Sequence, residues 1–126
     1  MSEMYGEFEA FAAELAGAPE RLAALVPPVV SKGALNIKED WAASLSGHPH
    51  LPHLPAAISY DMDVKPDSVS AEIGPDKNKK QGPLGSIAEF GTVNNPPRLD
   101  GARALATEAP KFEAACEAVA EQALLG

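Results

Sequence analysis

Residues 56–73, AAISYDMDVKPDSVSAEI, contain the clearest secondary-structure pattern in the chain. Over residues 56–64 apolar side chains alternate with polar ones, which is typical of a strand with one buried face. The alternation resumes over residues 69–73. Between them, KPDS at 65–68 has turn chemistry, because Pro fixes φ and Asp or Ser bonds the backbone. The pattern predicts a β-hairpin with a four-residue connection.

Three stretches before the hairpin predict helices, because apolar residues recur every three or four positions in 3–17, 20–26 and 29–46. Interruptions are expected where Gly and Pro cluster, above all at Pro27 and Pro28. We therefore expect a bent amphipathic helix first and a separate helix after the proline pair.

Two further patterns follow the hairpin. Residues 84–92, LGSIAEFGT, fit a helical turn capped by Gly91, and a short strand fits the periodicity nearly as well. At the end of the chain Pro110 marks a fresh helix start, since proline is tolerated in a first turn and poor in an interior. We expect a short turn at 101–107 and a main helix at 109–124.

Together these elements predict an α+β fold, a small antiparallel sheet built on the hairpin and packed by N-terminal and C-terminal helices. The 126 residues have the size of one domain, so residues 1–126 are expected to form a single domain. No run of about 18 apolar residues predicts a membrane helix, and acids at the N-terminus argue against a signal peptide. The net charge of -8 argues against a protein that coats DNA.

Three histidines, His48, His50 and His53, lie in GHPHLPHLP at residues 47–55. Imidazole nitrogens favour zinc or nickel, so a metal site is one hypothesis. The interleaved prolines hold the segment extended, with residues three apart separated by about 9 Å. No carboxylate or Cys within the segment supplies a fourth ligand. A stiff connector into the first strand is the favoured interpretation, and no metal or other cofactor is expected.

The single cysteine, Cys116, excludes an intramolecular disulfide and a Cys-rich zinc module. It lies on the apolar stripe of the last helix, which predicts a buried and inert thiol. No Gly-x-Ser-x-Gly elbow or phosphate-binding glycine loop is present. No catalytic residue is therefore expected, and a small hydrolase is disfavoured.

Two loops are candidate contact surfaces. The basic cluster of the chain, Lys77, Lys79 and Lys80, is interpreted as a solvated turn, with contact to phosphate or an acidic partner as the alternative. Residues 91–99, GTVNNPPRL, predict a semi-rigid projection, because the proline pair removes two backbone donors. Such a projection suits a contact between subunits and is equally compatible with an ordered surface loop.

Three stretches together resemble a known family: VVSKGALNIKEDW at 29–41, VSAEIGPDKNKKQGPLGSIAEFGT at 69–92 and EAPKFEAACEAVAEQ at 108–122. They are similar to the small neck, tail-completion or minor tail proteins of long-tailed phages with a flexible tail. Glu89-Phe90-Gly91-Thr92 is the part most typical of that family.

The resemblance implies a structural virion protein that is not an enzyme. It would form a homo-oligomeric ring at the head–tail joint, between head–tail connector proteins above and tail terminator and tube proteins below. Genome DNA would pass through its channel without sequence recognition, with no membrane involved. The protein would be in the host cytoplasm during assembly and in the neck of the virion afterwards.

The resemblance and the loop patterns also supply the site expectations. Candidates for the subunit interface are Glu89, Phe90, Gly91, Thr92, Asn94 and Asn95. Lys77, Lys79 and Lys80 are candidates to face the channel or a partner, and Phe90 is expected to be buried. Two alternatives stay open: the tail terminator itself, and a cytosolic metal-binding or regulatory domain that uses His48, His50 and His53.

Overall fold

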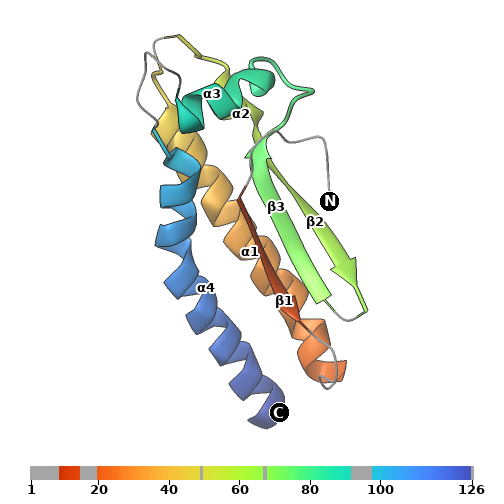
Figure 1. The fold of residues 1–126 in the computed structure, drawn as a ribbon. Coiled ribbons are helices and arrows are strands. Elements are labelled where there is room, and N and C mark those ends of the chain that lie inside the picture. The colour runs from red at the N-terminus through yellow and green to blue at the C-terminus, as the bar shows by residue number, and fades with distance from the viewer. Residues whose placement is uncertain (1–8, 15–19, 49, 67, 92–97, 126) are drawn as a thin grey trace.

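The computed structural model describes residues 9–14, 20–48, 50–66, 68–91 and 98–125 (Figure 1). Their elements, in chain order, are β1 (Glu9–Glu14), α1 (Glu20–Leu45), α2 (Leu54–Ala57), β2 (Ile58–Lys65), β3 (Ser68–Pro75), the 3-10 turn η1 (Gly82–Leu84), α3 (Gly85–Phe90) and α4 (Asp100–Leu125). The result is an α+β fold, in which helices pack on an antiparallel sheet built on the hairpin, as predicted.

The sheet has three antiparallel strands in the order β1-β3-β2. The predicted hairpin is confirmed, with Tyr60 opposite Ile73 and Met62 opposite Ala71. Its connection is shorter than predicted, because Lys65 and Ser68 pair as the last rung of the ladder. The inward residues of both strands face α1, and the hydroxyls of Tyr60 and Ser31 lie 3.4 Å apart.

The prediction of a helix over residues 3–17 is wrong for residues 9–14, which form β1. Phe11 lies opposite Ala71, and Ala13 lies opposite Val69. The Ala-rich and Glu-rich segment has helical propensity, but the free edge of β3 offers backbone partners along its whole length, and tertiary context overrides a weak local preference. The remainder of that predicted helix lies outside the described residues.

The expected interruption at Pro27 and Pro28 is also wrong, because α1 continues through both. A proline inside a helix removes one amide donor. Two carbonyls, of Ala23 and Ala24, lose their partners here, and since Ala24 and Pro28 are exposed and Ala23 and Pro27 are partly exposed, water can reach both. Val26 and Val30 on the opposite side are buried, and their packing holds the helix together across the pair.

Pro110 likewise lies inside one continuous helix, α4, and does not start a new one. The first half of α4 is held against α1, where Asn36 Nδ2 donates a hydrogen bond to Glu108 Oε2 at 3.2 Å. Both Pro110 and Ala106, whose carbonyl would have been its partner, are exposed. Packing against α1 therefore stabilises α4 as one continuous helix through the proline.

The sequence pattern of residues 84–92 fits a helix or a strand, and the structure shows the helix α3 over Gly85–Phe90. Gly91 follows with φ +77°, the left-handed conformation predicted for a C-terminal cap. At the first residue of α3, Gly85 packs on Pro75, and a Cβ there would lie 2.2 Å from the proline ring. The chain therefore turns tightly from the end of β3 into α3.

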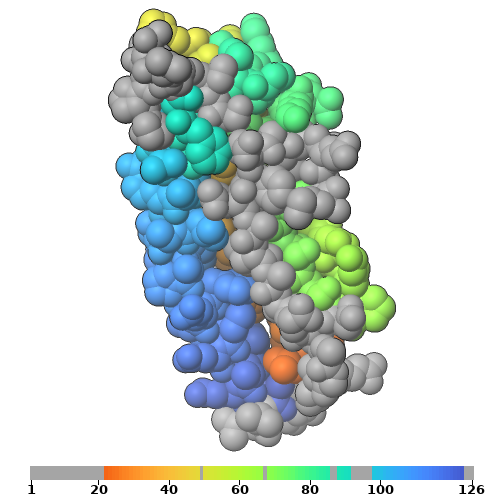
Figure 2. Space-filling model, viewed as in Figure 1, coloured from red at the N-terminus to blue at the C-terminus, as the bar shows by residue number. Residues whose placement is uncertain are grey.

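The hydrophobic core lies between α1, the inner face of the sheet and the first half of α4. Its buried members are Val26, Val30, Ala34, Ile37, Trp41, Leu45, Leu54, Ala57, Ile58, Val69, Ala71, Ile73, Ala88 and Ala104. Figure 2 shows α4 along one side of the molecule and the β2–β3 hairpin along the other. Of the helices described, none has both the length and the apolar character to cross a membrane.

Candidate functional site

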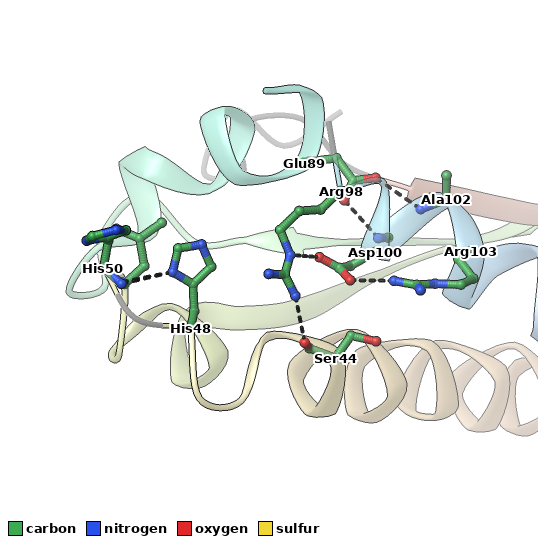
Figure 3. A network of polar contacts seen from close by, with 10 residues as sticks. Ser44, His48, His50, Glu89, Arg98, Asp100, Ala102 and Arg103 are labelled. Carbon is green, nitrogen blue, oxygen red and sulfur yellow. Dashed lines mark hydrogen bonds and ion pairs between the residues drawn. The ribbon is translucent and has the colours of Figure 1, made fainter. Parts of the chain in front are cut away.

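The predicted interface segment begins with Glu89, which is buried, with 3% of its surface exposed. Its carboxylate accepts hydrogen bonds from the backbone N–H of Gly101, at 2.8 Å, and of Ala102, at 3.1 Å (Figure 3). Its backbone oxygen accepts a third from Leu99 at 2.9 Å. Since the first amides of a helix have no intrahelical partner, Glu89 caps α4 from outside and complements its positive end.

Asp100, the first residue of α4, is 2% exposed and lies between two arginines (Figure 3). Arg98 Nε donates to Asp100 Oδ2 at 2.8 Å, and Arg103 Nη2 donates to Asp100 Oδ1. Arg98 Nη2 also donates to the backbone oxygen of Ser44 at 2.9 Å. This contact places a cation at the C-terminal end of α1, where the helix dipole favours positive charge and the last turn has no basic residue of its own.

Trp41 and Gly101 form the close contact that sets the distance between α1 and α4 at this end. A Cβ on Gly101 would lie 2.6 Å from the Trp41 ring, so only glycine allows this approach. The indole is almost completely buried. The end of α3, the start of α4 and the end of α1 are therefore joined by direct contacts.

The structure contradicts the expectation that Phe90 is buried, since half of its surface (50%) is exposed. Glu89 points inward, because its carboxylate accepts hydrogen bonds from two amides of α4. Phe90, the next residue in the helix, therefore points outward. Leu99 and Leu84 are exposed as well. Of the other predicted interface residues, Gly91 ends α3, whereas Thr92, Asn94 and Asn95 lie outside the described residues.

The lysines of the predicted solvated turn, Lys77, Lys79 and Lys80, are all exposed. The turn itself is well defined, because Asp76 Oδ1 accepts the N–H of Asn78 at 2.8 Å. Lys79 Nζ donates to Ser59 Oγ at 2.8 Å, which ties the turn to β2. Two of the three lysines, Lys77 and Lys80, have no hydrogen-bond or ion-pair partner in the part of the chain that the structure describes.

The histidine segment is a folded turn, contrary to the extended conformation expected for it. His48 Nδ1 accepts the N–H of His50 at 3.1 Å and of Leu51 at 3.2 Å (Figure 3). The backbone N–H of His53 donates to Gln81 Oε1 at 2.6 Å, and α2 begins at the next residue. The lone pair that His48 Nδ1 would offer a metal ion is thus engaged in the turn. Among the described residues, no three His, Cys, Asp or Glu side chains converge to hold a metal ion.

Cys116 is half-buried on α4. Its place on the apolar stripe predicted full burial, so that prediction is wrong in degree. Partial burial raises the pKa of its thiol, and the negative charge of Glu113 one turn earlier raises it further. Both effects disfavour the thiolate, which is the nucleophilic form. This environment suits an unreactive thiol.

No family model, no curated protein and no solved structure matches this chain. The functional conclusion therefore depends on the geometry of these residues. Within the described part, every buried side-chain nitrogen and oxygen has a hydrogen-bond partner. The buried carboxylates of Glu89 and Asp100 bond groups at the start of α4 and on Arg98. The apolar Phe90 and Leu99 and the cationic Arg98 and Arg103 are exposed in the same region.

Sequence reasoning did not identify Arg98, Asp100 and Arg103 as members of one site, and it did not foresee the capping role of Glu89. One local signal was present: an acid at the start of the last helical pattern with a base three residues later is a common first-turn arrangement. The partners of Glu89 and Arg98 are far along the chain, so no local pattern reports them.

Proposed function

We propose that this chain is a structural subunit of a ring at the head–tail joint of a long-tailed phage with a flexible tail. In this function it connects the head–tail connector to the tail terminator and tube, and its ring leaves a channel for the genome. It works by the contacts it makes with copies of itself and with adjoining virion proteins, not by catalysis.

The observation that supports this proposal best is the way the Glu89-Phe90-Gly91 element is built. Buried Glu89 anchors the element to α4, and Gly91 ends α3 in the left-handed conformation. Phe90 between them is held at the surface with half of its area exposed. An aromatic side chain on a rigid base loses little entropy when a partner covers it, and such residues are typical anchors of protein interfaces.

The charge of the chain is compatible with a channel for DNA. A net charge of -8 keeps a DNA duplex from adhering to the wall, because affinity for the phosphate backbone comes mainly from Lys and Arg. Exposed Lys77 and Lys80 lie on a turn that is fixed to β2 through Lys79. A few such cations can touch phosphate without reading sequence.

The deciding experiment is an electron-microscopy map of the native particle in which this chain is placed relative to the tail tube. The proposal expects a ring of this chain between the connector and the terminator. A ring that lies directly on the last tube ring would identify the chain as the tail terminator. Intact particles without the chain would refute both assignments.

A second measurement separates this proposal from the metal-binding alternative. Metal analysis of the purified chain and of a variant with His48, His50 and His53 replaced by Ala is expected to show no stoichiometric zinc in either. Zinc at one equivalent in the wild type, lost together with function in the variant, would contradict the proposal.

A further inference from the structure

Two charged surfaces of the described chain complement each other. We propose that copies of this chain join head to tail, with the guanidinium groups of Arg98 and Arg103 on one copy against the carboxylates of Asp61 and Asp63 on the next. This inference rests on the proposed function and deepens it, because it names the contact that closes the ring.

The first surface is a preorganised pair of guanidinium groups. Asp100 is buried between Arg98 and Arg103 and fixes the orientation of both. Their side chains are 40% and 62% exposed. Within the described residues, Arg98 uses two donor nitrogens and Arg103 uses one. A guanidinium has more N–H donors than that, and its planar fork fits a carboxylate in bidentate fashion.

The second surface is the outer face of β2. Tyr60 and Met62 pack toward the core, so Asp61 and Asp63 point to the other face of the sheet, and both are exposed. Asp63 has a contact of 3.4 Å with Lys65, but both side chains are more than half exposed, and such a pair is worth little. The Asp63 carboxylate can therefore exchange Lys65 for a guanidinium.

The same charges exclude the simplest symmetric contact. β2 is an edge strand, which pairs with β3 and with no other described strand. Two β2 edges facing each other would bring the aspartates of both copies together, and like charges on paired strands are destabilising. A contact between β2 of one copy and a cationic surface of another avoids this repulsion.

The two surfaces lie on opposite sides of the molecule. In the sheet order β1-β3-β2, β1 lies next to α4 and β2 is the strand furthest from it (Figure 1). In the close view the sheet lies behind the arginine network (Figure 3). One copy cannot bring its own two surfaces together, so each contact leaves one surface open for the next copy. That is the geometry of a heterologous interface, which gives a ring when the rotation closes.

DNA phosphate is the other anion that arginines bind. Useful affinity for a duplex needs several phosphate contacts. Two guanidinium groups supply few, whereas they match the two aspartates of β2 in number. The observations therefore favour a second copy of this chain, and DNA becomes an outcome of the test.

The test measures self-association by sedimentation velocity for the full chain, for Arg103→Glu and for Asp61→Lys. Each variant is expected to associate at least about tenfold more weakly than the wild type, because a charge pair becomes a repulsion. Lys32→Glu and Glu117→Lys are matched controls, with the same charge changes at other exposed positions, and are expected to associate like the wild type. Thermal unfolding shows whether each variant is folded, and Arg103→Gln replaces Arg103→Glu if the latter is not.

Mixing the two variants gives the sharpest result. In an equimolar mixture, the glutamate introduced by Arg103→Glu faces the lysine introduced by Asp61→Lys, and the wild-type pair forms at the alternate contact. Association is therefore expected to return to near the wild-type level, although each variant alone fails. Only a head-to-tail contact between these two surfaces predicts this complementation.

The inference is overturned if the wild type stays monomeric up to about 1 mM, a concentration that detects even weak association. It is also overturned if both variants associate normally, if the mixture fails to recover, or if Arg103→Glu weakens only the binding of duplex DNA. Rings that persist in the variants would refute this contact and leave the proposed function intact. Particles without the chain at the neck would refute the proposed function, whatever the solution measurements show.

Discussion

The carboxylate of Glu89 accepts a hydrogen bond from the backbone N–H of Gly101 at 2.8 Å, across twelve positions of sequence. The bond joins the end of α3 to the first turn of α4. A capping acid usually lies within a few residues of the helix it caps. Here the cap comes from another helix, so it fixes tertiary structure as well as the helix end.

Loss of this cap is the first prediction. Glu89→Ala is expected to lower the free energy of unfolding by about 2–3 kcal/mol, because two buried or partly buried amides lose their acceptor. Glu89→Gln keeps an acceptor oxygen and is expected to cost less. Chemical denaturation of both variants measures the difference. Equal stability of the alanine variant and the wild type would show that other groups satisfy those amides.

The contact between Trp41 and Gly101 gives a second prediction. Gly101→Ala is expected to destabilise the protein by about 1–3 kcal/mol, because the new Cβ overlaps the indole and the helices must move apart. The nearest atoms, Cη2, Cζ2 and Cε2, belong to the benzene ring fused to the outer side of the indole, and the smaller phenylalanine side chain has no second ring there. The cost of Gly101→Ala is therefore expected to shrink in a Trp41→Phe background. Purely additive stabilities in this double-mutant cycle would contradict the contact.

The sequence pattern predicts that Phe90 is buried, so that a charge there would unfold the protein. Because Phe90 is exposed, the structure predicts instead that a charge is tolerated. Phe90→Asp is expected to change the free energy of unfolding by no more than about 0.5 kcal/mol, as for other surface substitutions. The same variant is expected to fail in particle assembly. Ile73→Asp, at a buried position of β3, is the matched control and is expected to unfold the protein. Normal assembly with Phe90→Asp would remove this residue from the interface.

The lysine turn should be dispensable for folding. Replacing Lys77, Lys79 and Lys80 by Ala removes one exposed hydrogen bond, from Lys79 to Ser59, and is expected to cost less than about 0.5 kcal/mol. Thermal unfolding tests this, and genome retention by particles that carry the variant tests the channel role. A variant that does not fold would mean that the turn bears on the stability of β2.

The thiol of Cys116 provides a test that depends on pH. Its pKa is raised by partial burial and by the charge of Glu113, so less thiolate is present at pH 8 than for an ordinary cysteine. Alkylation by iodoacetamide is expected to be severalfold slower than for a cysteine in an unfolded peptide, and to accelerate as the pH rises toward the raised pKa. Glu113→Gln removes the second effect and is expected to speed the reaction at pH 8. A rate equal to that of the peptide would contradict the assigned environment.

Much of the fold could be predicted, because the forces that form it are local. Alternation over residues 56–73 is sufficient to predict the hairpin, since one face of each strand must be buried. Gly91 was recognisable as a helix end, because few other residues adopt its φ of +77°. The same local reasoning failed at Pro27 and Pro110, where packing on both sides outweighs one missing hydrogen bond each.

The candidate site was only partly predictable. The sequence by itself determined that Glu89 and Phe90 are adjacent and that an apolar stripe forms a helix at the end of the chain, although it placed the start of that helix near residue 109. Only the tertiary structure decided that Glu89 turns inward to α4, that Phe90 turns outward, and that Arg98 reaches the end of α1. It also decided that residues 9–14 add a strand to β3. Each of these choices depends on a hydrogen-bond partner far along the chain, and a local pattern contains no information about where folding will bring that partner.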